Sequence, residues 1–116
     1  MTFSDTDTQL DAVFGALAHP IRRALLARLA EGEERTVTEL AAPFDVTLMA
    51  VSKHLATLER AGLVARESDG RFRRCRLTPA PLGAAAGWLA QQARFWNSSL
   101  GSLAAYVTKG TQEEAE

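Results

Sequence analysis

An amphipathic helix followed directly by a basic hairpin constrains the fold of this chain more than any other feature. Thr47 can cap a helix that runs to about residue 61, and Gly62 occupies the place of a left-handed C-terminal cap. Apolar residues recur at helical spacing along one face of that helix: Leu48, Val51, Leu55 and Leu58. Two extended runs around an Asp-Gly pair, within residues 63–77, then predict a β-hairpin. This order predicts an α+β domain.

The rest of the chain is mostly helical. We predict helices over about 8–18 and 20–31, a short helix capped by Thr38, and a last helix over about 80–107. The predicted fold class is therefore mainly α (α+β), with about five helices and a two-stranded hairpin. One domain covers residues 10–107, between a flexible acidic N-terminal tail (1–9) and a flexible acidic C-terminal tail (108–116).

Composition excludes several classes of protein. With 116 residues, 47 % hydrophobic and 23 % charged, the chain resembles an average globular domain and not a disordered one. Its longest uncharged run, 77–93, is interrupted by proline and glycine and falls short of a membrane span. We expect no signal peptide, because the first residues are acidic and polar. The single cysteine, Cys75, allows no internal disulfide, so we expect a cytoplasmic protein.

Charge is distributed unevenly along the chain. The net charge is −1, yet the window 50–80 holds seven basic and three acidic residues. Four of the bases are arginines within 71–76, at the hairpin. A local basic patch in a near-neutral protein indicates an anionic partner, although a solvated face remains the alternative on charge alone.

The order of a short helix, a turn, an amphipathic helix and a basic hairpin is the plan of a winged helix-turn-helix. In such a motif the second helix enters the major groove of DNA, and flanking elements hold phosphates. Lys53 can contact a phosphate or a guanine, and Met49 can touch a thymine methyl group. The residues that we expect to contact double-stranded DNA are Thr47, Met49, Ser52, Lys53, His54, Thr57, Arg71, Arg73 and Arg74.

The last helix has a second signal, a heptad seam. Apolar residues from Leu82 to Val107 alternate in steps of four and three over more than three heptads. Intramolecular packing against the first helix would use this stripe, but self-association accounts better for its length. We therefore predict a homodimer with these interface residues: Val13, Leu17, Leu89, Ala93, Trp96, Leu100 and Leu103.

Residues 39–64, ELAAPFDVTLMAVSKHLATLERAGLV, resemble the helix-turn-helix core of ArsR-type (arsenic-repressor-like) winged-helix bacterial transcription regulators. Residues 16–29 and 79–107 are similar to that family's second and last helices, so the resemblance covers about 10–107. It implies a homodimer joined by its first and last helices, bound to a palindromic operator and commonly repressing its own operon. The match carries Thr47, Ser52, Lys53 and His54 over as DNA contacts, and the hairpin arginines as backbone contacts.

The ligand sets of the family's metal sensors are missing from this sequence. The predicted third helix has no Cys-x-Cys pair, and the last helix lacks His, Asp, Glu and Cys before the tail. We therefore expect no metal, no cofactor and an effector that the sequence does not identify. No phosphate loop or catalytic set occurs, so we expect no enzyme. Two alternatives stay open: a protein–protein assembly module, and a repressor that senses thiol oxidation through Cys75.

Overall fold

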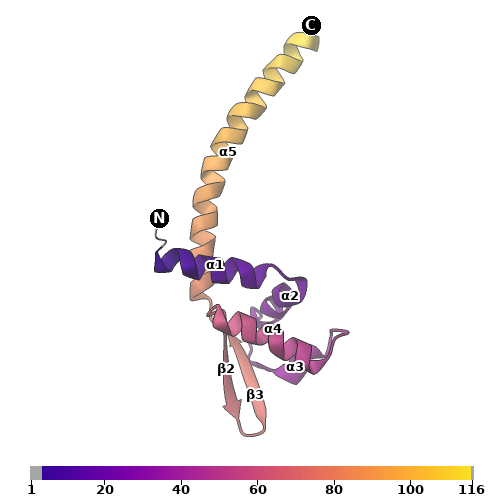
Figure 1. Ribbon diagram of the computed structural model, residues 1–116. Coiled ribbons are helices and arrows are strands. Elements are labelled where there is room, and N and C mark those ends of the chain that lie inside the picture. Colours follow the sequence, from indigo (N-terminus) through magenta and orange to yellow (C-terminus); the bar gives the residue numbers. More distant parts are fainter. Residues whose placement is uncertain (1–3, 116) are drawn as a thin grey trace. The chain divides into compact units, whose positions relative to one another are not determined.

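The computed structural model describes the backbone of residues 4–115 and the side chains of residues 4–68 and 70–101. Its elements in chain order are α1 (Asp5–Leu17), α2 (Pro20–Leu29), β1 (Arg35–Thr36), α3 (Val37–Ala41), α4 (Leu48–Arg60), β2 (Val64–Asp69), β3 (Phe72–Leu77) and α5 (Ala80–Ala115). Five helices with a small antiparallel sheet form a winged helix-turn-helix, as predicted (Figure 1). The chain divides between residues 85 and 86 into two compact units.

The sheet has three strands and not the two that the sequence predicts. Their order is β1-β3-β2, and every pair is antiparallel. β1 is only two residues long and pairs Arg35 with Cys75 and Thr36 with Arg74. A strand this short has no alternation of apolar and polar residues to recognise, and only its pairing with β3 defines it. Gly70, with φ of 63°, forms the β2–β3 turn that the Asp-Gly pair predicts.

Two helices begin earlier than predicted because capping boxes fix their starts. The Asp7 amide donates to Ser4 Oγ, and the Ser4 amide donates back to the Asp7 carboxylate, both at 3.2 Å. α1 therefore begins at Asp5, within the segment assigned to a flexible tail. Thr36 and Glu39 form the same reciprocal pair, at 3.1 and 3.2 Å, so Thr36 caps α3 instead of the predicted Thr38.

The helix ends follow the sequence signals in most places. Gly32 and Gly62, with φ of 95° and 78°, follow α2 and α4 in the left-handed region that favours glycine. α5 extends to Ala115, beyond the predicted end near residue 107. The flexibility of segments 1–9 and 108–116 stays a prediction.

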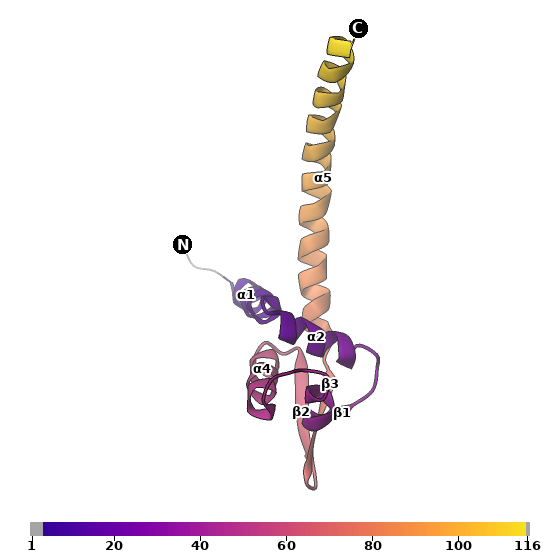
Figure 2. The same ribbon diagram turned by 90° about the vertical axis from the view of Figure 1, so that its right-hand side faces the viewer.

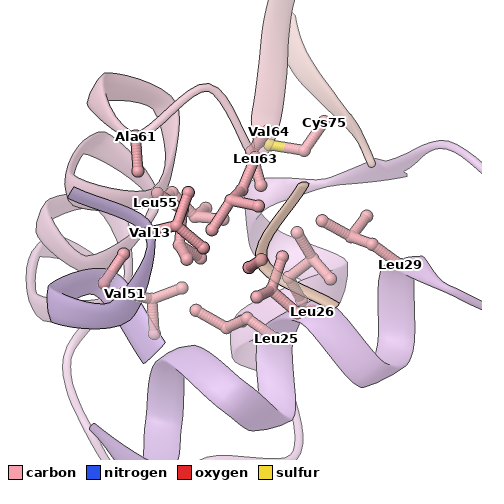
Figure 3. Close-up of a cluster of buried hydrophobic side chains, with 14 residues drawn as sticks. Val13, Leu25, Leu26, Leu29, Val51, Leu55, Ala61, Leu63, Val64 and Cys75 are labelled. Atoms are coloured by element: carbon pink, nitrogen blue, oxygen red, sulfur yellow. The ribbon is translucent and has the colours of Figure 1, made fainter. Parts of the chain in front are cut away.

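The core of the first unit lies between α1, α2, α3, α4 and the sheet (Figure 3). Leu25, Leu55, Leu58 and Leu63 are completely buried, and Val13 contributes from α1. Leu48 is the exception to the predicted stripe on α4, because 52 % of it is exposed. It is the first residue of the helix, one turn before Val51, where the buried face begins. Its apolar side chain is therefore available at the surface.

No helix among the described residues is both long and apolar enough to cross a membrane.

Candidate nucleic-acid interface

One face of α4, next to the hairpin, is exposed to solvent. The Thr47 hydroxyl accepts a hydrogen bond from the Ala50 amide (3.1 Å), which confirms the predicted cap. Met49 and Lys53 lie on the exposed face, with 69 % of Met49 accessible. In the two views at right angles, the β2–β3 hairpin lies beside α4 (Figures 1 and 2). The exposed face of α4 and the hairpin are therefore neighbours in the fold.

A groove of about 580 Å³ separates the start of α4 from the hairpin. Its lining comes from the end of β1, α3, the start of α4, and the start of β3 with the turn before it: Thr36, Val37, Thr38, Leu48, Met49, Ser52, Arg71, Phe72 and Arg73. The contact residues predicted from the sequence do not include five of these: Thr36, Val37, Thr38, Leu48 and Phe72. Helical periodicity assigned Leu48 to the core, and nothing in the sequence indicates that Phe72 faces α4. The groove therefore combines apolar side chains with two exposed arginines, Arg71 and Arg73.

Arg66 fixes the hairpin against α4. Its guanidinium donates to Ser52 Oγ (3.4 Å) and to the Glu59 carboxylate (3.2 Å), both on the helix. Ser52 is half-buried and already holds this contact. Ser52 thus orients the hairpin relative to the helix, while its position on the flank of α4 keeps it beside the exposed face.

The hairpin arginines differ in their exposure and in their contacts. Arg71 and Arg73 are exposed, whereas Arg74 is half-buried. Arg76 forms an ion pair with Glu67 across the strands (3.2 Å). Among the side chains that the structure describes, Arg71 and Arg73 are the exposed hairpin arginines without an ion pair to an acidic residue, and both lie near the turn. On α4, Thr57 donates to the Lys53 carbonyl (3.3 Å) and accepts from Arg60 (3.2 Å).

His54 packs against the α1–α2 junction. Its ring lies 4.3 Å from the ring of His19, centroid to centroid, and Arg22 Nη1 is 3.3 Å from its Nδ1. Because a guanidinium can only donate, Nδ1 accepts and carries no proton. Arg22 also donates to the Ala16 carbonyl (2.6 Å) and so connects the end of α1 to α4. His19 itself caps α2 by accepting from the Ile21 amide (3.1 Å).

This packing predicts that acid weakens the fold. Burial, the neighbouring His19 and the Arg22 charge lower the pKa of His54 below its usual value. The unfolded chain therefore binds this proton more readily, and stability falls as the pH drops below about 6.5. We expect urea midpoints to fall between pH 7.5 and 5.5, and to fall less in His54→Gln. An equal fall in both proteins would contradict this account of His54.

The surroundings of Cys75 make its thiol unreactive. It is completely buried in β3, and burial raises the pKa of its thiol despite the nearby Arg66 and Arg73 charges. A reactive thiol needs exposure and a lowered pKa. The thiol-sensing alternative therefore has no support from this site, and Cys75 acts as a packing residue.

The predicted dimer residues fall into two groups. Val13 is in the core with 1 % exposed, and Leu17 is half-buried against that core. On α5, the exposed members of the seam are Leu89, Ala93, Trp96 and Leu100. Phe95 and Trp96 pack edge to face at 5.6 Å. The Leu103 side chain lies outside the described residues.

Among the described residues, no group of three or more His, Cys, Asp and Glu side chains is placed to hold a metal ion. The expectation that the chain takes no metal stays a prediction.

Known proteins are similar to this chain in sequence and in architecture. Residues 17–67 match a family model described as a helix-turn-helix domain. The chain is 38 % identical over 97 residues to the HTH-type transcriptional regulator Rv2034 of Mycobacterium tuberculosis, covering 84 % of this chain and 87 % of the relative. It is 39 % identical over 69 residues to an uncharacterized HTH-type transcriptional regulator, YuzN, of Bacillus subtilis, covering 54 % of this chain and 75 % of the relative.

Solved structures agree with these relatives. A crystal structure of an ArsR family transcriptional regulator, RHA00566, superposes with a TM-score of 0.74 at 42 % identity, covering 84 % of this chain and 98 % of that one. The homodimeric winged helix-turn-helix DNA-binding domain Mb0332 of Mycobacterium bovis gives a TM-score of 0.61 at 26 % identity, covering 80 % and 91 %. These relatives are described as transcriptional regulators, the class of protein predicted from the sequence. The chain therefore belongs to the ArsR family of DNA-binding helix-turn-helix transcriptional regulators.

Proposed function

We propose that the protein is a homodimeric repressor that binds a palindromic operator in a sequence-specific way. The observation that carries this proposal is that the exposed face of α4, the groove and the exposed hairpin arginines are neighbours in the fold. A surface of this kind offers base-reading groups from the helix and phosphate-binding groups from the hairpin.

Each half of the surface has its own role. The first residues of α4 enter the major groove, where Thr47, Met49 and Lys53 meet base edges and phosphates. Arg71 and Arg73 bind the backbone or the adjacent minor groove, with Arg74 beside them. Ser52, His54 and Thr57 complete the set predicted from the sequence. Ser52 contacts Arg66, His54 contacts Arg22, and Thr57 contacts Arg60. These contacts support a role in holding the exposed face of α4 in place.

The exposed seam of α5 supports the dimer. Leu89, Trp96 and Leu100 are each at least half exposed, and their heptad spacing is typical of helices that pair. The relative Mb0332 is homodimeric. A two-fold dimer places its recognition helices on half-sites about 10–10.5 base pairs apart, or a multiple of that spacing. Occupation of such an operator represses transcription where the operator overlaps a promoter, and the upstream DNA of the protein's own gene is the natural candidate.

The charged residues predict a specific salt dependence. Arg73→Ala removes a phosphate contact, so it should weaken binding to every sequence and reduce the slope of log K against log salt by about 1. Lys53→Ala should instead cost roughly 1–3 kcal/mol if it reads a guanine, and relax one operator position. Fluorescence anisotropy over a salt series measures both effects.

Arg94→Ala, at an exposed arginine on α5, is the matched control and should bind as wild type does. Full affinity in both Lys53→Ala and Arg73→Ala would refute the proposed DNA surface. If a protein complex were lost instead, the assembly alternative would replace it.

A further inference from the structure

Exposed apolar side chains of the first unit gather around the start of α4 and the start of β3. Among the residues of that unit whose side chains the structure describes, the large hydrophobic ones with substantial exposure are Val46, Leu48, Met49 and Phe72, at 38 %, 52 %, 69 % and 57 %. The first three lie at the start of α4 and in the turn before it, and Phe72 begins β3 across the groove. Large apolar groups left in water at one spot mark an interaction surface and not a chance distribution.

The groove between these residues has an apolar centre and a basic edge. Leu48, Met49 and Phe72 line it together with Val37, while Arg71 and Arg73 belong to the same lining. An occupant must therefore offer apolar groups flanked by negative charge. Duplex DNA does so where thymine methyl groups line the major groove between two phosphate backbones, and the methyl is the one apolar group that a base displays there.

We propose that Leu48, Met49 and Phe72 form an apolar reading surface for thymine methyl groups in the operator. The inference rests on the proposed function and specifies what the N-terminal end of α4 recognises. Leu48 and Met49 are the first two residues of the helix, the end whose residues reach base edges. Neither side chain can donate or accept a strong hydrogen bond, so discrimination here comes from burying a methyl group and not from hydrogen bonds. Lys53 lies more than one turn further along α4, and it contacts a base edge or a phosphate through its positive charge.

The test removes single methyl groups from the DNA. A high-affinity duplex is first selected by the protein from a randomised pool, and each thymine is then replaced by deoxyuridine, which lacks only the methyl. Burying one such carbon contributes about 0.8 kcal/mol, or about a fourfold change in affinity. Anisotropy titrations should therefore show about fourfold weaker binding at each contacted thymine.

Substitutions assign the effect to the protein side. Leu48→Ala, Met49→Ala and Phe72→Ala remove exposed side chains and should keep the fold, which circular dichroism checks. Each should weaken binding to the thymine duplex and bring the ratio of thymine to deoxyuridine affinity toward one at its own position. Lys53→Ala, the matched control on the same helix, should weaken binding and leave that ratio unchanged.

The failures of the two proposals are distinguishable. Specific binding that is indifferent to every deoxyuridine overturns the methyl-reading surface and leaves the proposed function intact. An unchanged ratio in all three alanine variants overturns it as well. Failure to select any specific duplex overturns both proposals. Loss of a complex with a second copy or another protein in the alanine variants, without loss of DNA binding, would assign the groove to that occupant.

Discussion

Trp96→Glu and Leu89→Glu are each expected to give 12.5 kDa monomers that no longer bind a full palindrome tightly. Both residues belong to the heptad seam and are half or more exposed in the single chain. Pairing two seams would bury them, and a buried, unpaired carboxylate in that position is strongly unfavourable. Loss of the second half-site contact lowers affinity by about 10²–10⁴, because bivalent binding multiplies the affinity of each half.

Sedimentation measures the mass, and anisotropy compares a full palindrome with a single half-site. Gln91→Glu is the matched control, since it adds the same charge to an exposed position of α5 outside the seam. It should remain dimeric. Monomeric variants should bind the half-site almost as wild type does, so the loss is confined to the palindrome. Dimers that survive both seam substitutions would refute the interface assignment.

Leu55→Ala is expected to destabilise the domain by about 2–5 kcal/mol. Leu55 is completely buried in the middle of α4, so truncation removes apolar contacts and leaves a cavity. Domains of this size have a free energy of unfolding of about 5–15 kcal/mol, so the loss is a large share of the total. Urea unfolding at a fixed protein concentration measures it, since dimerisation would also contribute to the apparent stability.

Met49→Ala is the control on the same helix. With 69 % of its surface exposed, it should change the free energy of unfolding by no more than about 0.5 kcal/mol. The pair therefore separates the folding role of the inner face of α4 from the reading role of its outer face. A cost below about 1 kcal/mol for Leu55→Ala would contradict the assigned core.

The sequence predicts well wherever a local signal decides the structure. Thr47 as an N-cap, Gly62 as a C-cap and the Asp-Gly turn all depend on residues a few positions apart. The buried face of α4 follows from helical periodicity for Val51, Leu55 and Leu58. These features place the helix and the hairpin that form the candidate interface.

The sequence predicts less well where distant contacts decide. β1 exists only because it pairs with β3, some 40 residues later. Leu48 fits the apolar period but lies beyond the end of the core. The sequence predicts His54 as a DNA contact, yet its ring contacts His19 and Arg22, more than 30 residues earlier. Periodicity predicts which face of a helix is buried. It contains no information on which residues of other elements contact that helix.

The most direct test of the central claim is fluorescence anisotropy of the purified protein with its own upstream DNA and with scrambled DNA, at two salt concentrations. We expect binding to the upstream DNA at least about a thousandfold tighter than to the scrambled duplex, with the preference maintained at both salt concentrations. Equal and strongly salt-dependent binding to the two duplexes, or binding to neither, would contradict a sequence-specific repressor.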